Sequence, residues 1–203
     1  MILDFSSLPT RDVYNWMVDT INPRPIAWVS TISTEGRTNL APFSFFQGIT
    51  SNPPTLMFVP VNNREGGKKD TIRNIEQVPE FVVNIVNYTL AEKMNATAGL
   101  YPYGESEFEK CGVKSAASEK VRPPRVAEAP VAFECTLDRI IHIGEGPLAA
   151  NVVFGRIHVV HVNDGVLNAN GHIDPAKLDT IGRMGGEIYS RTTDRFWLKR
   201  PDR

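Results

Sequence analysis

Residues 131–143 read VAFECTLDRIIHI, and residues 151–163 read NVVFGRIHVVHVN. Both runs are rich in Val, Ile and Phe, which favour β-strands. The short segment Gly144-Glu145-Gly146-Pro147 and the few residues after it separate them. A connection this short joins antiparallel strands, because a parallel crossover needs a dozen or more residues. The two runs therefore predict a long β-hairpin.

The connection itself matches another pattern. Residues Gly144 to Ala149 fit the GxGxxA pattern of dinucleotide-binding loops, and Asp164 follows Gly144 by 20 residues. That interpretation requires a helix to begin at the glycines. Pro147 and the early start of the second strand leave no room for a helix, so we interpret the segment as a hairpin turn.

The rest of the chain continues the β pattern. Strands are expected at residues 26–33, 38–46, 55–61 and 80–88, and short helices at 70–78 and 89–97. Residues 98–130 are rich in Gly and Pro and predict an irregular excursion. Helices do not alternate with strands, which argues against a parallel doubly wound sheet. The sequence predicts a mainly β fold, an antiparallel barrel, closed or partly closed, with a few short peripheral helices.

Composition indicates one folded domain. The chain has 203 residues, 41% of them hydrophobic, and 22 Lys+Arg balance 23 Asp+Glu. A nucleic-acid or anionic-membrane binder would need a basic surplus, so neither partner is expected. We expect a single domain over 1–203, with its core at about 20–165 and a C-terminal extension at 166–203. The 15 prolines exceed the average content; several stand just before predicted strands (Pro25, Pro54, Pro79, Pro130 and Pro147).

Cysteine usage and the N-terminus predict a cytoplasmic protein. Cys111 and Cys135 lie 24 residues apart without a CxxC or paired-His pattern, which argues against a disulfide framework and a zinc site. The first residues lack a basic region followed by an apolar one, and no run approaches the ~18 apolar residues of a membrane span. No metal site is expected at His158 and His161 either, because their spacing on a strand sends the rings to opposite faces.

A candidate anion site precedes the first predicted helix. Lys68-Lys69-Asp70-Thr71 ends a polar, glycine-containing loop and opens the helix that carries Ile72 and Ile75. Free backbone N–H groups, the helix dipole, a hydroxyl and adjacent lysines suit a phosphate group. The alternative is an ordinary Asp or Thr N-cap flanked by solvated lysines.

Residues 39–46, NLAPFSFF, are unusual for a strand. Pro42 removes a hydrogen-bond donor, so this strand must lie at a sheet edge or beside a ligand. The phenylalanines around Ser44 suit either a flat aromatic ligand or the core. Trp28, on the preceding strand, could likewise face a cofactor ring or donate its indole N–H to a carbonyl in the core.

Arg183 stands among the glycines of the segment Gly182-Arg183-Met184-Gly185-Gly186. It could clamp a phosphate or carboxylate, or anchor the C-terminal tail through a salt bridge. The sequence contains no GxSxG, no HExxH and no convincing carboxylate pair, so hydrolase chemistry is not indicated.

Several linked motifs together resemble the flavin reductase-like proteins with an FMN-binding split β-barrel, especially the longer flavoredoxin-like branch. The resemblance extends over about residues 20–200 and rests on Arg24 to Thr31, Asn39 to Phe46, Ser51 to Pro54, Lys69 to Ile75, Glu80 to Asn84, and Arg183 to Gly186 with Tyr189.

The resemblance implies bound FMN and a homodimer with the flavin near the subunit interface. Backbone and small polar groups of the first hairpin would hold the ring, and Ser44, Lys69 and Thr71 the phosphate. The loop at 62–67 is longer than usual, which leaves open whether Lys68 or Lys69 is the phosphate partner. The implied cofactor-binding set is Asn22, Trp28, Val29, Ser30, Thr31, Asn39, Ala41, Pro42, Phe43, Ser44, Lys68, Lys69, Asp70, Thr71 and Arg183.

The resemblance further implies an oxidoreductase that uses NAD(P)H to reduce a flavin or another small acceptor through FMN. Because the flavin carries the chemistry, no side chain is expected as acid or base. One alternative is a non-enzymatic electron-transfer flavoprotein, flavoredoxin-like, that serves a redox partner protein. A split-barrel module for a different planar ligand is disfavoured by Ser44 and Lys69-Asp70-Thr71. Nothing in the sequence separates NADH from NADPH.

Overall fold

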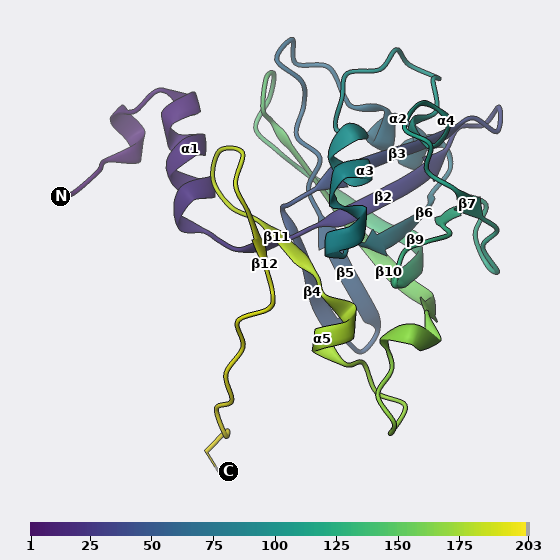
Figure 1. The fold of residues 1–203 in the computed structure, drawn as a ribbon. Coiled ribbons are helices and arrows are strands. Elements are labelled where there is room, and N and C mark those ends of the chain that lie inside the picture. Colours follow the sequence, from purple (N-terminus) through teal and green to yellow (C-terminus); the bar gives the residue numbers. More distant parts are fainter. Residues whose placement is uncertain (202–203) are drawn as a thin grey trace.

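Seven strands form the main sheet, and every neighbouring pair is antiparallel. The computed structural model describes residues 1–201, so the end of the expected extension, residues 202–203, lies outside the described part. The strands are β2 (Ala27–Ile32), β3 (Thr38–Phe43), β4 (Phe46–Ser51), β5 (Pro54–Phe58), β6 (Glu80–Ile85), β9 (Val131–Ile143) and β10 (Ala150–Val162). Their order across the sheet is β3-β2-β6-β9-β10-β5-β4 (Figure 1).

The connection between the two outermost strands makes this sheet a barrel. β3 and β4 lie at opposite edges of the sheet, yet only Ser44 and Phe45 connect them. Three extended residue steps span about 10 Å. The sheet must therefore curl until its edges meet, and it stays split between β3 and β4, where no ladder forms. The expected antiparallel split β-barrel is confirmed.

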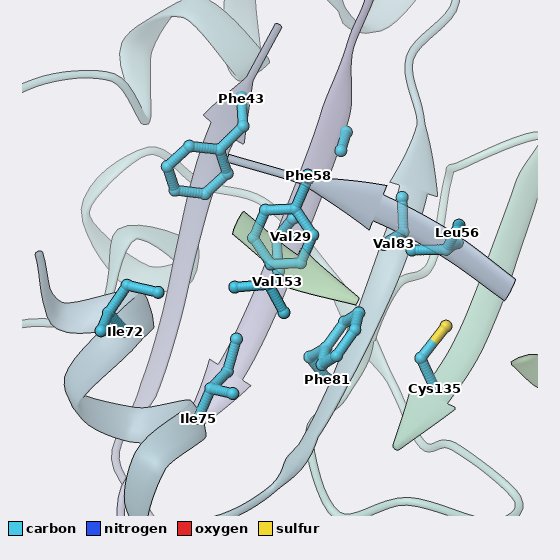
Figure 2. Packing of buried hydrophobic residues seen from close by; sticks show 11 residues of the cluster. Val29, Phe43, Leu56, Phe58, Ile72, Ile75, Phe81, Val83, Cys135 and Val153 are labelled. Atoms are coloured by element: carbon cyan, nitrogen blue, oxygen red, sulfur yellow. The ribbon is translucent and has the colours of Figure 1, made fainter. Parts of the chain in front are cut away.

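The barrel interior is filled by large apolar side chains (Figure 2). Phe58 lies between two other rings, with centroids 5.4 Å from Phe43 and 5.3 Å from Phe81. Helix α2 (Asp70–Gln77) inserts Ile72 and Ile75, both fully buried, into the same cluster. These contacts fix α2, and hence its N-terminus, relative to β3.

A second apolar cluster covers the outer face of β2 and β3. Trp28 and Leu40 meet residues from the 3-10 helix η2 (Tyr88–Leu90) and from helices α3 (Ala91–Ala96) and α4 (Glu107–Lys110). Within the irregular excursion, β7 (Ser115–Ala116) and β8 (Arg125–Val126) form a small hairpin. The excursion therefore folds back onto the barrel rather than joining two domains.

A segment before the barrel and a segment after it pair in a separate three-stranded sheet. β1 (Arg24–Pro25), β11 (Ile181–Arg183) and β12 (Tyr189–Arg191) pair beside helix α1 (Thr10–Thr20) (Figure 1). Gly185, between β11 and β12, allows this hairpin to approach the end of α1 closely, because a Cβ there would lie 1.7 Å from the Asp19 carboxylate. The remaining elements are the 3-10 helices η1 (Phe5–Ser7) and η3 (Asp164–Val166) and the helix α5 (Pro175–Leu178).

Most expected elements are confirmed. β9 has the expected bounds, β10 begins one residue early, and Gly144 to Pro147 lies in the hairpin connection between them. The single strand expected at 38–46 is wrong, because the chain crosses the barrel split at Ser44-Phe45 and continues as β4. Helix α1 was not expected; only Val18 in it is buried, so its apolar pattern is weak.

Candidate functional site

A groove runs over the edge strand β3. It consists of two cavities, of about 280 Å³ and about 170 Å³, which share Pro42 and Ala98. Together they reach the size range of small-molecule and cofactor sites, ~300–1,000 Å³. The larger cavity is lined by Asn39, Ala41, Pro42, Asn63, Lys68, Lys69, Asp70, Thr71, Arg73, Thr97, Ala98, Gly99, Leu100, Tyr101, Tyr103 and Glu107. The smaller is lined by Ile26, Pro42, Ser44, Met94, Asn95, Ala98, Arg183 and Tyr189.

Pro42 sits where its missing N–H faces the groove. The neighbouring outward N–H, that of Leu40, donates to the Glu107 carboxylate at 2.8 Å instead of to another strand. Pro42, two residues further along, has the same orientation, so the ladder with β2 loses no hydrogen bond. The expectation that this proline lies at a sheet edge is confirmed.

The N-terminus of α2 opens into the larger cavity with unused donors. No side chain caps this helix, and within residues 1–201 the backbone N–H groups of Asp70 and Thr71 have no acceptor. The Thr71 hydroxyl accepts from the Asn39 amide at 3.1 Å, which leaves its own proton available. Free N–H groups and a hydroxyl at the positive end of a helix form an anion site.

The two lysines beside this helix differ in their partners. Lys68 is paired with Glu76 at 2.5 Å. Lys69 has no hydrogen bond and no ion pair in the described part of the chain, and its ammonium lies 5.8 Å from the centre of the Phe43 ring. Lys69 reaches solvent through the cavity mouth, yet enough protein surrounds it that desolvation lowers its pKa. Lys69 is thus the cation at this site that lacks a counter-ion.

Two carboxyl groups share the larger cavity. Desolvation raises the pKa of Glu107, while hydrogen bonds from backbone N–H groups oppose the shift and the charge of Asp70 adds to it. Desolvation also raises the pKa of Asp70, against the opposing charge of Arg73 at 3.8 Å. Both groups therefore hold protons more readily than ordinary acids, which weakens their repulsion of an anionic ligand.

The smaller cavity has one arginine, Arg183, and no acidic residue in its lining. Arg183 stacks on Tyr189, with its guanidinium carbon 4.5 Å from the ring centre, and donates to the Gly186 carbonyl. Arg24, behind the cavity, is 5% exposed and donates to Ser44 Oγ at 3.4 Å. Burial lowers the pKa of Arg24, and the charge of Arg183 adds to that effect. The salt bridge considered for Arg183 is not present within residues 1–201.

The structure brings together nine of the expected cofactor residues. They line one cavity or the other and are Asn39, Ala41, Pro42, Ser44, Lys68, Lys69, Asp70, Thr71 and Arg183.

The strand β2 residues do not reach the groove. β2 is paired on both sides, so its backbone has no free edge, and the side chains of Trp28, Val29, Ser30 and Thr31 are fully buried. Trp28 Nε1 donates to the Thr97 hydroxyl at 2.8 Å in the outer cluster. Of the two placements considered for Trp28, the structure therefore has the one in the core.

Two further residues are placed elsewhere. Phe43 points into the barrel core and touches the site only through Lys69. Asn22 donates to the Asp19 carbonyl at 2.5 Å, is exposed, and lines neither cavity. As direct ligands both are disfavoured.

Sequence reasoning missed one whole wall of the groove. Residues 98–103, interpreted as part of an irregular excursion, contribute Tyr101 and Tyr103, and Glu107 follows them. The sequence signal that could have identified this wall is the pair of tyrosines between glycines in residues 97–104, TAGLYPYG. Arg24 lies inside a motif that was recognised, but only the fold shows that its guanidinium reaches Ser44.

Neither a metal site nor a membrane span is found in the described residues. Residues 1–201 hold no group of three or more His, Cys, Asp or Glu side chains arranged to bind a metal ion. No helix in that range has the length and apolar character needed to cross a bilayer.

Known proteins match the chain over most of its length. Residues 20–177 match the family model of the flavin reductase like domain. Nitrilotriacetate monooxygenase component B from Bacillus cereus is 32% identical, with a TM-score of 0.92 and 98% of each chain covered. The 2-nitrobenzoate 2-nitroreductase NbaA of Pseudomonas fluorescens is 31% identical, with a TM-score of 0.89 over 99% of this chain and 96% of that one.

Flavoredoxin of Desulfovibrio vulgaris (Miyazaki F) is less similar. It is 22% identical, with a TM-score of 0.73 over 98% of this chain and 97% of that one. At this identity the likeness is one of fold alone.

Proposed function

The chain belongs to the flavin reductase-like family, as its motifs predicted, and we propose on that premise that it is an FMN-dependent oxidoreductase. It would transfer electrons from NAD(P)H through bound FMN to a flavin or another small acceptor. A nitroreductase and a monooxygenase component are among the proteins it resembles. A free flavin and a small nitroaromatic compound are therefore both acceptors to test.

The observation that carries this proposal is the unpaired Lys69 beside the uncapped N-terminus of α2. A cation without a counter-ion, two free N–H groups and the Thr71 hydroxyl converge on one end of the groove. That donor set matches the phosphate of FMN. Lys69 rather than Lys68 would be the phosphate partner, because Lys68 is already paired with Glu76.

The remainder of the groove would take the ring. Pro42 and Ala98 connect the two cavities, and the outward backbone of β3 runs beside them. Hydride transfer from a nicotinamide and onward electron transfer is the chemistry that FMN supplies when bound. The chain's own part would be to bind and orient: α2 and Lys69 would hold the phosphate, and Pro42 and Ala41 would flank the ring. Ser44, which the resemblance assigned to the phosphate, would lie at the ring instead, because it lines the cavity that does not contain Lys69.

We further propose a homodimer with the flavin near its interface. Helix α1 exposes Tyr14 and Met17, Ile21 just after it is also exposed, and Trp197 is 100% exposed. α1 and the β11–β12 hairpin lie together on the side of the barrel that carries Arg183 (Figure 1). A second copy would cover these apolar side chains. Light scattering coupled to gel filtration should then give twice the chain mass.

An anaerobic absorbance titration tests the activity. Protein saturated with FMN should be yellow and should lose its visible absorption on addition of NADH or NADPH. Yellow protein that ignores both nucleotides, yet is reduced by a reduced carrier protein, would identify an electron-transfer flavoprotein instead. Colourless protein that takes up no added FMN would overturn the proposal.

A further inference from the structure

Two guanidinium groups converge on the end of the groove away from α2. Arg183 lines the smaller cavity directly, and Arg24 lies behind Ser44. Arg24 is held rigidly, since it donates to the carbonyls of Val18 at 2.5 Å, Ile21 at 2.8 Å and Met184 at 2.8 Å. These contacts tie the end of α1 and the loop after β11 to the barrel.

Nothing in the described chain neutralises this pair of charges at close range. Within residues 1–201, neither guanidinium has a carboxylate oxygen within 4.0 Å. Asp19 acts on Arg24 in the favourable direction, but it lies beyond ion-pair distance. Burying a cation without a counter-ion is costly unless a ligand compensates it. Arg24 is 5% exposed and lies next to a cavity, where a bound anionic ligand would offset the cost of burying its charge.

The opposite end of the groove is different. There Lys68 has Glu76, Arg73 has Asp70, and Glu107 lies in the cavity lining. Mixed charges at that end suit a phosphate that is always anionic. The end at Arg183 has excess positive charge only, so it favours a group that gains negative charge.

We propose that Arg24 and Arg183 form a cationic end of the groove that binds the ring of reduced FMN in preference to that of oxidised FMN. The inference rests on the proposed function and on placing the phosphate at α2. The oxidised ring is neutral, whereas the two-electron-reduced ring readily loses a proton and carries a negative charge. Arg183 faces the cavity; Arg24 is a positioning residue that acts through Ser44 and through its charge.

The consequence is thermodynamic. A site that binds the reduced form more tightly raises the midpoint potential of the bound flavin by linkage. Preference for the reduced form also means that the protein retains flavin while it is reduced and releases it more readily once oxidised. The preference comes from charges already placed in the fold, so it costs no rearrangement.

Binding measurements on both redox forms test this inference. Anaerobic calorimetry would give the dissociation constants of oxidised FMN and of dithionite-reduced FMN for wild type, Arg183→Gln, Arg183→Lys and Arg139→Gln. Arg139 is an exposed arginine of β9 that lines neither cavity, so its variant controls for loss of one positive charge. Arg24 itself is avoided at first because its three carbonyl contacts hold the fold together.

We expect Arg183→Gln to weaken binding of reduced FMN about tenfold and of oxidised FMN less than about threefold. Arg183→Lys should fall between Arg183→Gln and wild type, because lysine keeps the charge but loses the stacking on Tyr189. The ratio of the dissociation constant of reduced FMN to that of oxidised FMN then rises by up to about tenfold. For a two-electron couple, that lowers the midpoint potential by up to about 30 mV. Equal weakening of the binding of both redox forms, or no change in either, would overturn the inference. The proposed function would still stand, because wild type would still bind FMN. Wild type that binds neither form would instead overturn the proposed function.

Discussion

Replacing Lys69 by Ala should weaken FMN binding and spare riboflavin binding. Lys69 stands without an ion pair or hydrogen bond at the uncapped end of α2. Riboflavin lacks the phosphate but has the same ring, so it separates loss of a phosphate contact from damage to the groove. Lys68→Ala is the matched control, because it removes the same charge from the adjacent position, where Glu76 already pairs with it.

The magnitude follows from the kind of contact that is lost. Hydrogen bonds to charged groups contribute about 1.5–3 kcal/mol. Lys69 is open to solvent at the cavity mouth, so screening places it at the lower end, about 1.5 kcal/mol. That corresponds to roughly a tenfold increase in the dissociation constant for FMN. Lys68→Ala should change it by less than about fivefold, since an exposed, already paired charge contributes ~0–1 kcal/mol.

Quenching of flavin fluorescence, titrated at fixed ionic strength, measures both ligands on all three proteins. The expected result is a weaker affinity for FMN in Lys69→Ala alone, with riboflavin unchanged throughout. Equal losses for FMN and riboflavin would mean that Lys69 shapes the groove rather than binding phosphate. A larger loss in Lys68→Ala would refute the assignment from ion-pair geometry.

Three further outcomes concern the scaffold. A Cβ at Gly155 would lie 2.2 Å from Phe81 Cζ, so Gly155→Ala should lower the unfolding free energy by about 1–3 kcal/mol in urea titrations, whereas Gly48→Ala, with open space around it, should not. Burial raises the pKa of Glu134, but hydrogen bonds from a histidine and two backbone N–H groups outweigh this and lower it overall. This carboxylate therefore contributes stability above the ordinary glutamate pKa, and that contribution is lost as pH falls toward the lowered pKa. Over that window Glu134→Gln should reduce the slope of unfolding free energy against pH, by no more than the ~1.4 kcal/mol per pH unit that one proton can contribute. Burial also raises the pKa of the Cys135 thiol strongly, so Cys135 should resist alkylation until the protein unfolds, and reaction of both thiols in the native state, counted by mass spectrometry, would contradict that burial.

The strands with strong local signals could be predicted from the sequence. The run at 131–143 and its partner have the period, residue types and short connection of a hairpin, and the structure keeps those bounds within a residue. Pro42 likewise indicated an edge position, because a residue without an N–H donor is tolerated only where a strand needs no partner on that side. The candidate anion site at Lys69-Asp70-Thr71 could be proposed from the sequence because a helix N-terminus is a local feature, and the structure does begin a helix at Asp70.

Features that depend on distant parts of the chain could not be predicted. Trp28 and Thr31 carry no sign of whether β2 has a partner on one side or on both, and that alone decides whether they face a ligand or the core. Lys68 pairs with Glu76, and Arg24 donates to the Met184 carbonyl. Only folding brings these partners together, so the sequence pattern does not show them. The walls from residues 97–107 lack any period, so tertiary packing alone places them.

The pairing of β1 with β11 sets an order of assembly. Arg24 lies opposite Arg183, so the small sheet closes a loop that includes nearly the whole polypeptide. Such a closure carries a large entropic cost unless the intervening chain is already compact. The barrel strands end at Val162, and β11 and β12 follow them in the chain, so the barrel can pair before the small sheet closes. The half of the groove that contains Arg183 and Tyr189 is then completed after the barrel, and a chain cleaved between Val162 and Ile181 would keep every barrel strand but only half a groove.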